Sequence, residues 1–491
     1  MLMNGKPSAL RRAIQPSDPI GFADWLHHAC RVRGAIVAGC TLVSAVAAPA
    51  SNANTVTAPA PLWQKPAWLT DFGVGIKESY DNNVLMVVER GVTMPLQSSW
   101  ITTVSPKLGF DFAPLVGHPE TWQKLALVYA PEVGTYHDAD AENYAAHKIT
   151  NSIAARSGDF SFSVDNGFQF IDGNRSGPTF QLPSGKKEDY SVLAVSAVRE
   201  RRLQVQDALG VTLRYDAGKF FIRPAASLLY YDLMTDWHNG GMGSGPSLPG
   251  YVGYINYVDR TDANGGLDAG LKVAANLAAT VGYRYGHQYQ QSLPAEINSL
   301  AVNGQQAQSS SDYQRLLLGL EGRPWEWLTV NLRAGPDFRE YNLAAPVDDR
   351  RPVTYYSEGA VTAAVTANQS LSFSCKHWQW ESSIGRLPYV ENIYMLAYHW
   401  NPVRQLGFDV SGRFANQDYT CGSSKLSNGA SLRNDAMYTF ALGTTYLFTP
   451  NLSASLGYAY DLGRNLQDNG SAGDYRQFNH EVVSLGVKFR F

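Results

Sequence analysis

Charged side chains alternate with apolar ones along much of this sequence, and basic residues dominate a set that could contact a solute. Guanidinium and ammonium groups recognise carboxylates and phosphates through charge-assisted hydrogen bonds. Unpaired charges are too costly to bury in a dry core, so water or dense ion pairing must surround this set. Its members are Lys107, Asp111, Arg214, Arg223, Arg284, Arg315, Arg333, Arg413 and Lys488. Two interpretations stay open: a wall that favours anionic or hydroxyl-rich solutes, or mutually neutralising pairs that only hold the wall in place.

Enzyme motifs are absent from the sequence. Neither Gly-x-Ser-x-Gly, His-Glu-x-x-His nor Cys-x-x-Cys occurs, and histidines such as His137, His287, His377 and His480 are scattered. A hydrolytic site would need a nucleophile, a histidine and an orienting partner close together. We therefore expect no enzyme, and no catalytic, cofactor-binding or metal-binding residues.

The last stretch of the chain, 479–491, carries the clearest structural pattern. Val483, Leu485, Val487, Phe489 and Phe491 fall on one face, opposite serine, glycine and basic residues. This period of two is typical of a strand with one apolar side. A strand that is apolar to its final residue fits a face in contact with lipid. The ending resembles the C-terminal strand of bacterial outer-membrane proteins, in which the terminal aromatic residues, here Phe489 and Phe491, belong to the signal for barrel assembly.

Similar alternation recurs along the chain, and short and long connections follow one another between the strands. Tight links such as 156–158, 217–219 and 449–451 alternate with long ones such as 234–259 and 416–435. Bacterial barrels have an even number of strands, short periplasmic turns and long extracellular loops. The sequence therefore predicts an all-β fold, a transmembrane antiparallel β-barrel of about 18 strands (16–18). The predicted strands are 72–80, 99–112, 125–135, 144–155, 160–170, 203–216, 220–232, 265–274, 277–289, 313–322, 328–340, 354–366, 371–381, 389–400, 406–414, 437–447, 452–462 and 479–491.

Two features resist this scheme. Segment 190–202 is itself strand-like, and we interpret it as an extension of its neighbour beyond the membrane. Asp207 falls on the apolar face of its strand. Tryptophans lie near both predicted ends of the strands, where amphipathic rings favour the two membrane interfaces. Those near the periplasmic turns are Trp122, Trp325, Trp327 and Trp400, and those toward the outer ends are Trp100, Trp378 and Trp380.

The N-terminus has the pattern of an export signal. Arginines precede an apolar run at 34–48, which is followed by small residues. We expect a secretory signal peptide at 1–50, a periplasmic linker at 51–70 and the barrel at 71–491. A lipoprotein-type cleavage before Cys40 is a weaker alternative, because the apolar run ahead of it is short. Cleavage of the signal would leave Cys375 and Cys421, which allow a disulfide without implying one.

Three stretches near the start of the predicted barrel resemble the β-barrel porin type 2 family of Gram-negative outer membranes. Tyr80-Asp81-Asn82-Asn83 ends the first strand, Ser105-Pro106 marks the second, and a tyrosine-bearing strand, 127–131, follows. The resemblance covers mainly the first quarter of the chain. It implies an outer-membrane barrel, carries no catalytic residues and leaves the solute unassigned.

The leading hypothesis is a porin-like channel in the cell outer membrane, through which small hydrophilic solutes diffuse passively. The expected partners are outer-membrane lipid, the barrel-assembly machinery and those solutes, with the barrel a monomer or a homotrimer. The net charge of −3 gives no reason to expect nucleic acid. The alternatives are a non-transporting surface barrel whose long loops bind polysaccharide or other cells, and a channel that exports exopolysaccharide.

The alternation of loops predicts which tags reach the cell surface. Epitope tags inserted near Gly243 or Ser424 are expected to bind antibody on intact cells, because both positions lie in long loops. Tags near Gly218 or Asn451 should bind antibody only after the outer membrane is permeabilised. Surface labelling of this second pair would contradict the predicted topology.

Overall fold

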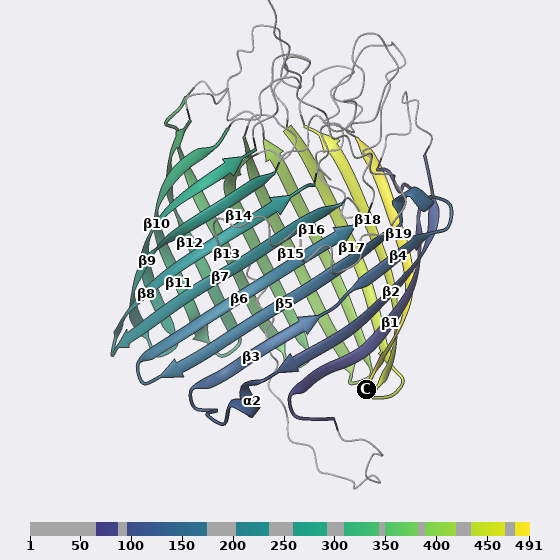
Figure 1. Cartoon of the computed structure of the whole chain (residues 1–491), viewed down its shortest axis with the longest axis horizontal. Helices are drawn as coiled ribbons and strands as arrows, with labels where there is room; N and C mark the ends of the chain where they lie inside the picture. The colour runs from purple at the N-terminus through teal and green to yellow at the C-terminus, as the bar shows by residue number, and fades with distance from the viewer. Residues whose placement is uncertain are drawn as a thin grey trace, which may run out of the picture. The chain divides into compact units, whose positions relative to one another are not determined.

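The described residues form one antiparallel sheet that closes on itself (Figure 1). The structure, a computed structural model, describes residues 65–86, 96–173, 203–234, 259–291, 309–342, 349–381, 388–418, 434–466 and 477–491. All of them belong to one compact unit of the chain, Ala38–Phe491. No helix in these ranges is long and apolar enough to cross a membrane.

The sheet contains 19 strand segments, and the described residues also include two short helices. The segments are β1 (Leu69–Asp81), β2 (Ser99–Asp111), β3 (Trp122–Tyr129), β4 (Glu132–Tyr136), β5 (Tyr144–Ser157), β6 (Phe160–Asp172), β7 (Gln204–Ala217), β8 (Phe220–Asp232), β9 (Arg260–Ala274), β10 (Leu277–Gln290), β11 (Ser311–Trp325), β12 (Leu328–Tyr341), β13 (Val353–Thr366), β14 (Gln369–Trp380), β15 (Tyr389–Val403), β16 (Leu406–Asp418), β17 (Asn434–Leu447), β18 (Leu452–Asn465) and β19 (Phe478–Arg490). Helix α2 (Ala113–Val116) follows β2, and the 3-10 helix η1 (Asp140–Glu142) follows β4.

β3 and β4 occupy a single place in the wall, so the 19 segments make an 18-stranded barrel. Both pair with β2 on one side and with β5 on the other. Pro131 lies between them, and proline has no N–H to donate to the ladder. The predicted count of about 18 strands is confirmed, and the predicted strand 125–135 is one interrupted strand.

The barrel closes where β1 meets β19. Their pairing is antiparallel and runs from Gly73 opposite Arg490 to Asp81 opposite Val482. The backbone N–H of Phe491 extends this seam by donating to the carbonyl of Phe72 at 2.8 Å. A sheet closed in this way leaves no unpaired edge for hydrocarbon to meet.

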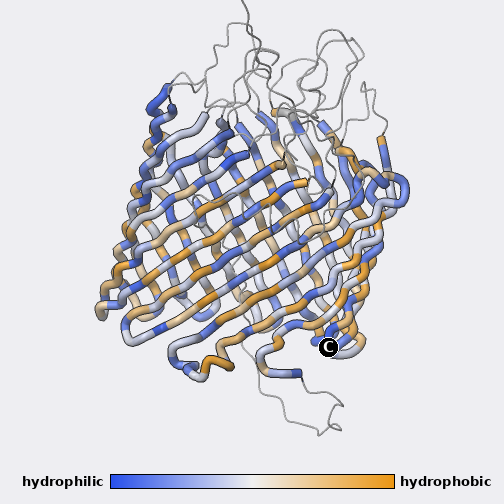
Figure 2. Tube along the Cα trace, in the orientation of Figure 1, coloured by the Kyte–Doolittle hydropathy of each residue, from blue (hydrophilic) through white to orange (hydrophobic). Residues whose placement is uncertain are grey.

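The outer face of the wall is apolar and its inner face is polar. Apolar and polar residues alternate along the strands in Figure 2, as period-two side chains must in a barrel. Leu318 and Phe220 are 68% and 62% exposed on the outside. Arg214 on β7 instead reaches Glu321 on β11, although three strands lie between them in the wall. Such a contact requires both side chains to point into the barrel.

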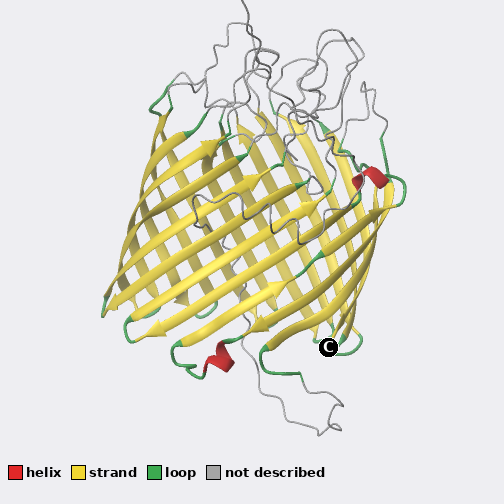
Figure 3. Cartoon of the chain, in the orientation of Figure 1, coloured by secondary structure: helices red, strands yellow, loops and turns green. Residues whose placement is uncertain are grey.

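Tight turns join the strands at the edge of the barrel where the chain ends, the lower edge of Figure 3. Gly158 (φ 57°) and Gly218 (φ 66°) form two of these turns in the left-handed conformation that glycine adopts most readily. β1 begins at this same edge, at Leu69. At the other edge the connecting segments mostly lie outside the described residues, as does the strand-like segment 190–202.

The structure corrects the prediction for two tryptophans. Trp378 and Trp380 do not lie at a membrane interface, because both rings are inside the barrel and only 7% and 2% exposed. Trp100, Trp325 and Trp327 are at least half exposed, at 50%, 58% and 52%. The level of the two rings along the strand is as predicted, but both belong to the set of alternate residues that faces the interior.

On the outer face, Asn151 on β5, Asn166 on β6 and Asp207 on β7 form a polar cluster. The Asn151 amide donates to the Asn166 side-chain oxygen at 3.0 Å, and the Asn166 amide donates to Asp207 at 2.5 Å. Asp207 pairs with Phe168 across the strands, which places it on the apolar face, as the sequence indicated. The hydrogen bonds satisfy amide groups that would otherwise meet lipid unpaired.

Deletion of Phe491 is expected to impair assembly more than stability. The Phe491 ring stacks on Phe72 with centroids 4.5 Å apart and contacts Phe489 at 4.6 Å. Loss of one partly buried aromatic ring costs about 3 kcal/mol at most, which a closed barrel should survive. The measurements are outer-membrane yield and heat-modifiable migration on gels. We expect low yield with a heat-modifiable surviving fraction, whereas wild-type yield would contradict the role of the terminal strand.

Candidate functional site

An ion-pair ladder lines the interior of the barrel between β7 and β13. Arg214 and Arg223 both reach Glu321, with N–O distances of 3.3 and 2.9 Å. Arg214 also pairs with Asp216 at 3.0 Å, and its guanidinium lies 3.6 Å from the centre of the Phe221 ring. These four charged residues come from three strands, β7, β8 and β11, so the ladder ties the wall together across its inner face.

Two aspartates hold the upper part of the ladder. Asp268 on β9 accepts from Arg223 at 3.0 Å and from Arg284 at 2.7 Å. Asp337 on β12 accepts from Arg315 at 2.8 Å and from Arg339 at 3.1 Å. Buried pairs of this kind stabilise only when both partners remain, because removing one partner leaves an uncompensated charge.

The structure thus brings together five of the predicted wall residues: Arg214, Arg223, Arg284, Arg315 and Arg333, the last paired with Glu358. The remaining candidates lie elsewhere in the wall. Lys107 pairs with Asp71 at 2.9 Å, while Lys488 on β19 lies opposite Gly75 on β1. Arg413 on β16 lies opposite Thr439. Asp111 accepts the backbone N–H groups of Ala113 and Leu125, both at 3.0 Å, and so shapes the β2–β3 turn.

The outer end of β14 leaves the wall and enters the barrel. Pairing between β13 and β14 stops at Ser357 opposite His377, although β13 extends outward to Val353. Pairing between β14 and β15 continues to Trp380 opposite Tyr389. β14 therefore keeps one neighbour and separates from the other.

The freed end of β14 contacts strands far away in the wall. The Gln379 carbonyl accepts from Gln288 on β10 at 3.1 Å and from Arg339 on β12 at 3.0 Å. Arg260 on β9 donates to the Glu381 carbonyl at 2.8 Å and to the Tyr389 hydroxyl at 3.1 Å. Four strands separate β9 from β14 in the wall, so these hydrogen bonds cross the interior.

Aromatic rings fill the space beneath this crossing. Trp378 stacks on Trp380 with centroids 4.7 Å apart, and Tyr231 on β8 meets Trp380 edge-on at 6.4 Å. The Arg260 guanidinium lies 4.9 Å from the Trp380 ring centre, within cation–π range. One side of the barrel is therefore filled at its outer end by side chains of its own wall.

A cavity of about 580 Å³ lies in the interior below this filled zone. Its lining includes five cations, Arg223, Arg284, Arg315, Arg333 and Lys376, and three carboxylates, Asp165, Asp262 and Glu358. Leu229, Leu317, Tyr356 and Trp378 contribute apolar surface. Asp268 and Asp337, which lie outside this lining, pair with Arg223, Arg284 and Arg315. The cavity wall is therefore charged but largely neutralised, with an organic surface beside it.

Several residues of this region were missed from the sequence. Glu358 and Lys376 lie on the inward face of predicted strands, so the period-two pattern could have identified them. Arg260 and Asp262 lie ahead of the predicted start of their strand at residue 265 and had no such pattern. The inward bend of β14 depends on contacts with distant strands, which the local sequence does not encode.

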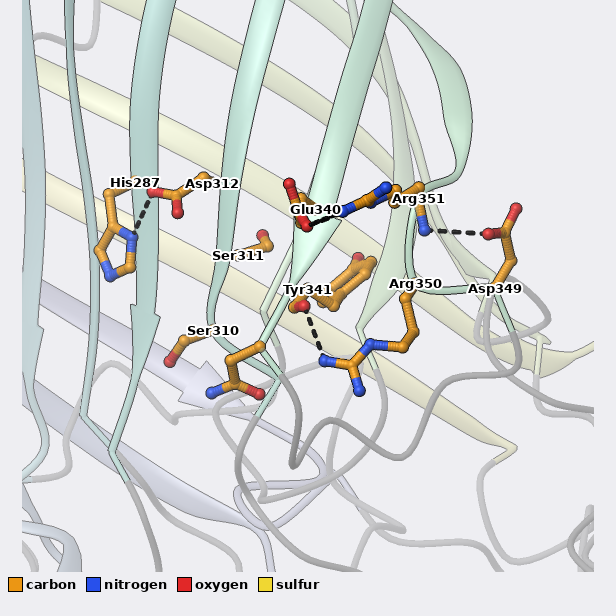
Figure 4. Close-up of a pocket in the computed structure, with 10 residues that line it drawn as sticks. His287, Ser310, Ser311, Asp312, Glu340, Tyr341, Asp349, Arg350 and Arg351 are labelled. Atoms are coloured by element: carbon orange, nitrogen blue, oxygen red, sulfur yellow. Dashed lines mark hydrogen bonds and ion pairs between the residues drawn. The ribbon is translucent and has the colours of Figure 1, made fainter.

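A second pocket, of about 700 Å³, lies at the outer rim between β10 and β13 (Figure 4). His287 contacts Asp312 at 2.9 Å, and Glu340 pairs with Arg351 at 2.7 Å. Arg350 donates to the Tyr341 carbonyl at 3.0 Å. Opposite charges in this pocket neutralise one another, and no cluster of three metal-ligating side chains occurs in the part of the chain that the structure describes.

The closed sheet, its apolar exterior and its charged interior define an outer-membrane β-barrel protein. No protein-family model matches the chain, and no curated protein matches its sequence. OpdK of Pseudomonas aeruginosa with vanillate is 13% identical with a TM-score of 0.39, over 87% of this chain and 100% of that one. OccK11 of the same species is 11% identical (TM-score 0.36; 86% and 96% covered). An anion-selective porin from Comamonas acidovorans is 12% identical (TM-score 0.33; 86% and 99% covered).

Two carboxyl groups just beyond the strand ends have raised pKa values. Burial raises the pKa of Glu381, which is fully buried, to about 7, although Ser311 donates to it at 3.2 Å. Burial, followed by repulsion from Asp232, raises the pKa of Asp259 to about 6. A raised pKa means that the folded protein binds the proton more tightly than the unfolded chain does. Protonation of either carboxyl group therefore stabilises the folded state.

Stability is therefore expected to fall as pH rises from about 4.5, the ordinary pKa of glutamate, through about 7. In this window the unfolded chain releases the Glu381 proton while the folded chain retains it. Glu381→Gln should match wild type near pH 4.5 and exceed it above pH 7, by on the order of 3 kcal/mol at most. The measurement is the free energy of unfolding in detergent at each pH, with tryptophan fluorescence as the signal.

The matched control is Glu340→Gln, which removes an exposed carboxylate at the outer end of β12 and should leave the pH dependence unchanged. An identical pH slope in Glu381→Gln and wild type would contradict the role of the buried carboxyl.

Proposed function

We propose that this protein is a channel of the cell outer membrane through which small hydrophilic solutes diffuse passively, with a preference for anions. The observation that carries the proposal is the charged inner wall with its internal cavity of about 580 Å³. Barrels of 16 to 18 strands usually leave an aqueous path. Among the described residues, four of the five lining cations have a carboxylate oxygen within 4.0 Å, and only Lys376 has none, which offers a place for an anion.

The proposal includes the export route and the family. The apolar run at 34–48 supports a signal peptide at 1–50, followed by a linker at 51–70. The motifs at Tyr80–Asn83 and Ser105-Pro106 support membership of the β-barrel porin type 2 family. The terminal residues Phe489 and Phe491 would be read by the barrel-assembly machinery, and the mature barrel would function as a monomer or homotrimer.

A second candidate is a surface barrel that does not conduct and whose outer loops bind polysaccharide or another cell. The filled outer end between β8 and β15 favours it, because those side chains block part of the interior. The two candidates differ in one property, the passage of ions.

Planar-bilayer recording of the purified, heat-modifiable protein separates them. A channel should give stepwise conductance in KCl, and a salt gradient should give a reversal potential of the sign that marks anion preference. A folded barrel without conductance would eliminate the channel and leave the surface-binding function. Cation preference would refute the assigned selectivity while retaining the channel.

A further inference from the structure

Lys376 on β14 differs from the other cations that line the internal cavity. Arg223, Arg284, Arg315 and Arg333 each have a carboxylate oxygen within 4.0 Å. Among the described residues, no carboxylate lies within that distance of the Lys376 ammonium. The ammonium lies instead 3.4 Å from the centre of the Trp378 ring. A cation–π contact is worth about 0.5 to 2 kcal/mol and does not replace a direct ion pair.

Arg315 provides a second donor in the same cavity. Its side chain is only 6% exposed, and its Nε is bound to Asp337. Its Nη2 is buried and has no hydrogen-bond partner in the described part of the chain. A buried donor without an acceptor costs about 1 to 3 kcal/mol, so a bound acceptor at this position would be stabilising.

Two of the carboxylates that line the cavity, Glu358 and Asp262, do not serve as acceptors for Lys376 or for the free Arg315 nitrogen. Glu358 is held by Arg333 and by the Tyr356 hydroxyl. Asp262 accepts from Tyr313 at 2.8 Å and from Gln288 at 2.6 Å. Their oxygens are thus already engaged with other donors, and neither carboxylate forms a direct ion pair with Lys376.

We propose that this cavity is a binding site for a small organic carboxylate, with Lys376 and Arg315 as its anion-binding residues. The carboxylate would accept from the Lys376 ammonium and from the unpartnered Arg315 nitrogen. Leu229 and Leu317 also line the cavity and would contact a short apolar body. The volume of about 580 Å³ accommodates such a molecule together with water.

This inference rests on the proposed channel function, which it deepens by naming a class of solute. The site lies below the inward end of β14. The strand that fills the outer part of the interior therefore also supplies Lys376. A solute that enters beside the filled zone would meet the Lys376 ammonium next.

The test uses butyrate as the anionic probe and butyramide as its neutral counterpart. The purified full-length barrel is titrated in detergent while tryptophan fluorescence is followed, because Trp378 lies against Lys376. Block of the chloride current by butyrate is measured in planar bilayers. We expect butyrate, but not butyramide, to change the fluorescence and reduce the current.

Lys376→Gln should weaken both effects of butyrate at least tenfold, in line with the loss of one charge-assisted hydrogen bond. Lys376→Arg should restore them, and thereby separate charge from folding. The control is Lys219→Gln, which removes the same charge from an exposed position in the β7–β8 turn and should leave both effects unchanged.

Three results would overturn the site: equal effects of butyramide and butyrate, unchanged butyrate binding in Lys376→Gln, or an equal loss in Lys219→Gln. The failure of the channel function is distinguishable, because absent conductance with intact, Lys376-dependent fluorescence binding would reject the channel and retain the site.

Discussion

The hydrogen-bonded seam between β1 and β19 is the constraint on which the rest of this structure depends. In hydrocarbon an unpaired backbone N–H or carbonyl costs several kcal/mol, so a sheet in a membrane must close. Closure fixes the number of strands and their alternation, and it decides that every second side chain points inward. Gly73 and Gly75 of β1 lie opposite Arg490 and Lys488 of β19 along the seam, and a Cβ at Gly73 would collide with the Phe489 carbonyl.

Once the wall is closed, its inward charges must be compensated inside a limited space. The protein does this mainly with ion pairs between strands, such as Arg214 with Glu321 and Arg315 with Asp337. Paired charges hold neighbouring strands in register but offer little to a solute. Chemical selectivity therefore resides in the few groups that the pairing leaves over, and Lys376 is the clearest of these in the described wall.

Much of the fold could be predicted from the sequence, because each barrel strand is indicated by a local alternation of apolar and polar residues. The 18 places in the wall, the sidedness of Arg223 or Phe489 and the positions of the tight turns all follow from that pattern. The site was less accessible. Partners such as Arg260 and Glu381 lie far apart in the sequence. A period of two predicts which face of the wall a side chain occupies, but it does not predict which residues that side chain contacts. The misplaced Trp378 and Trp380 have a different cause. Both share the alternation of Lys376, which faces the interior, so the period of two already placed their rings inside the barrel.

The Arg260 contacts also have a mechanical consequence. A barrel without contacts across its interior flattens easily under lateral load. A strut, meaning a contact between distant strands across the interior, restrains one diameter of the barrel. Arg260 joins β9 to β14 and β15 in this manner, through the Glu381 carbonyl and the Tyr389 hydroxyl. The strut restrains the separation of β9 from β14 and β15, so changes in membrane tension would deform chiefly the strands outside this stretch, β16 to β19 and β1 to β6.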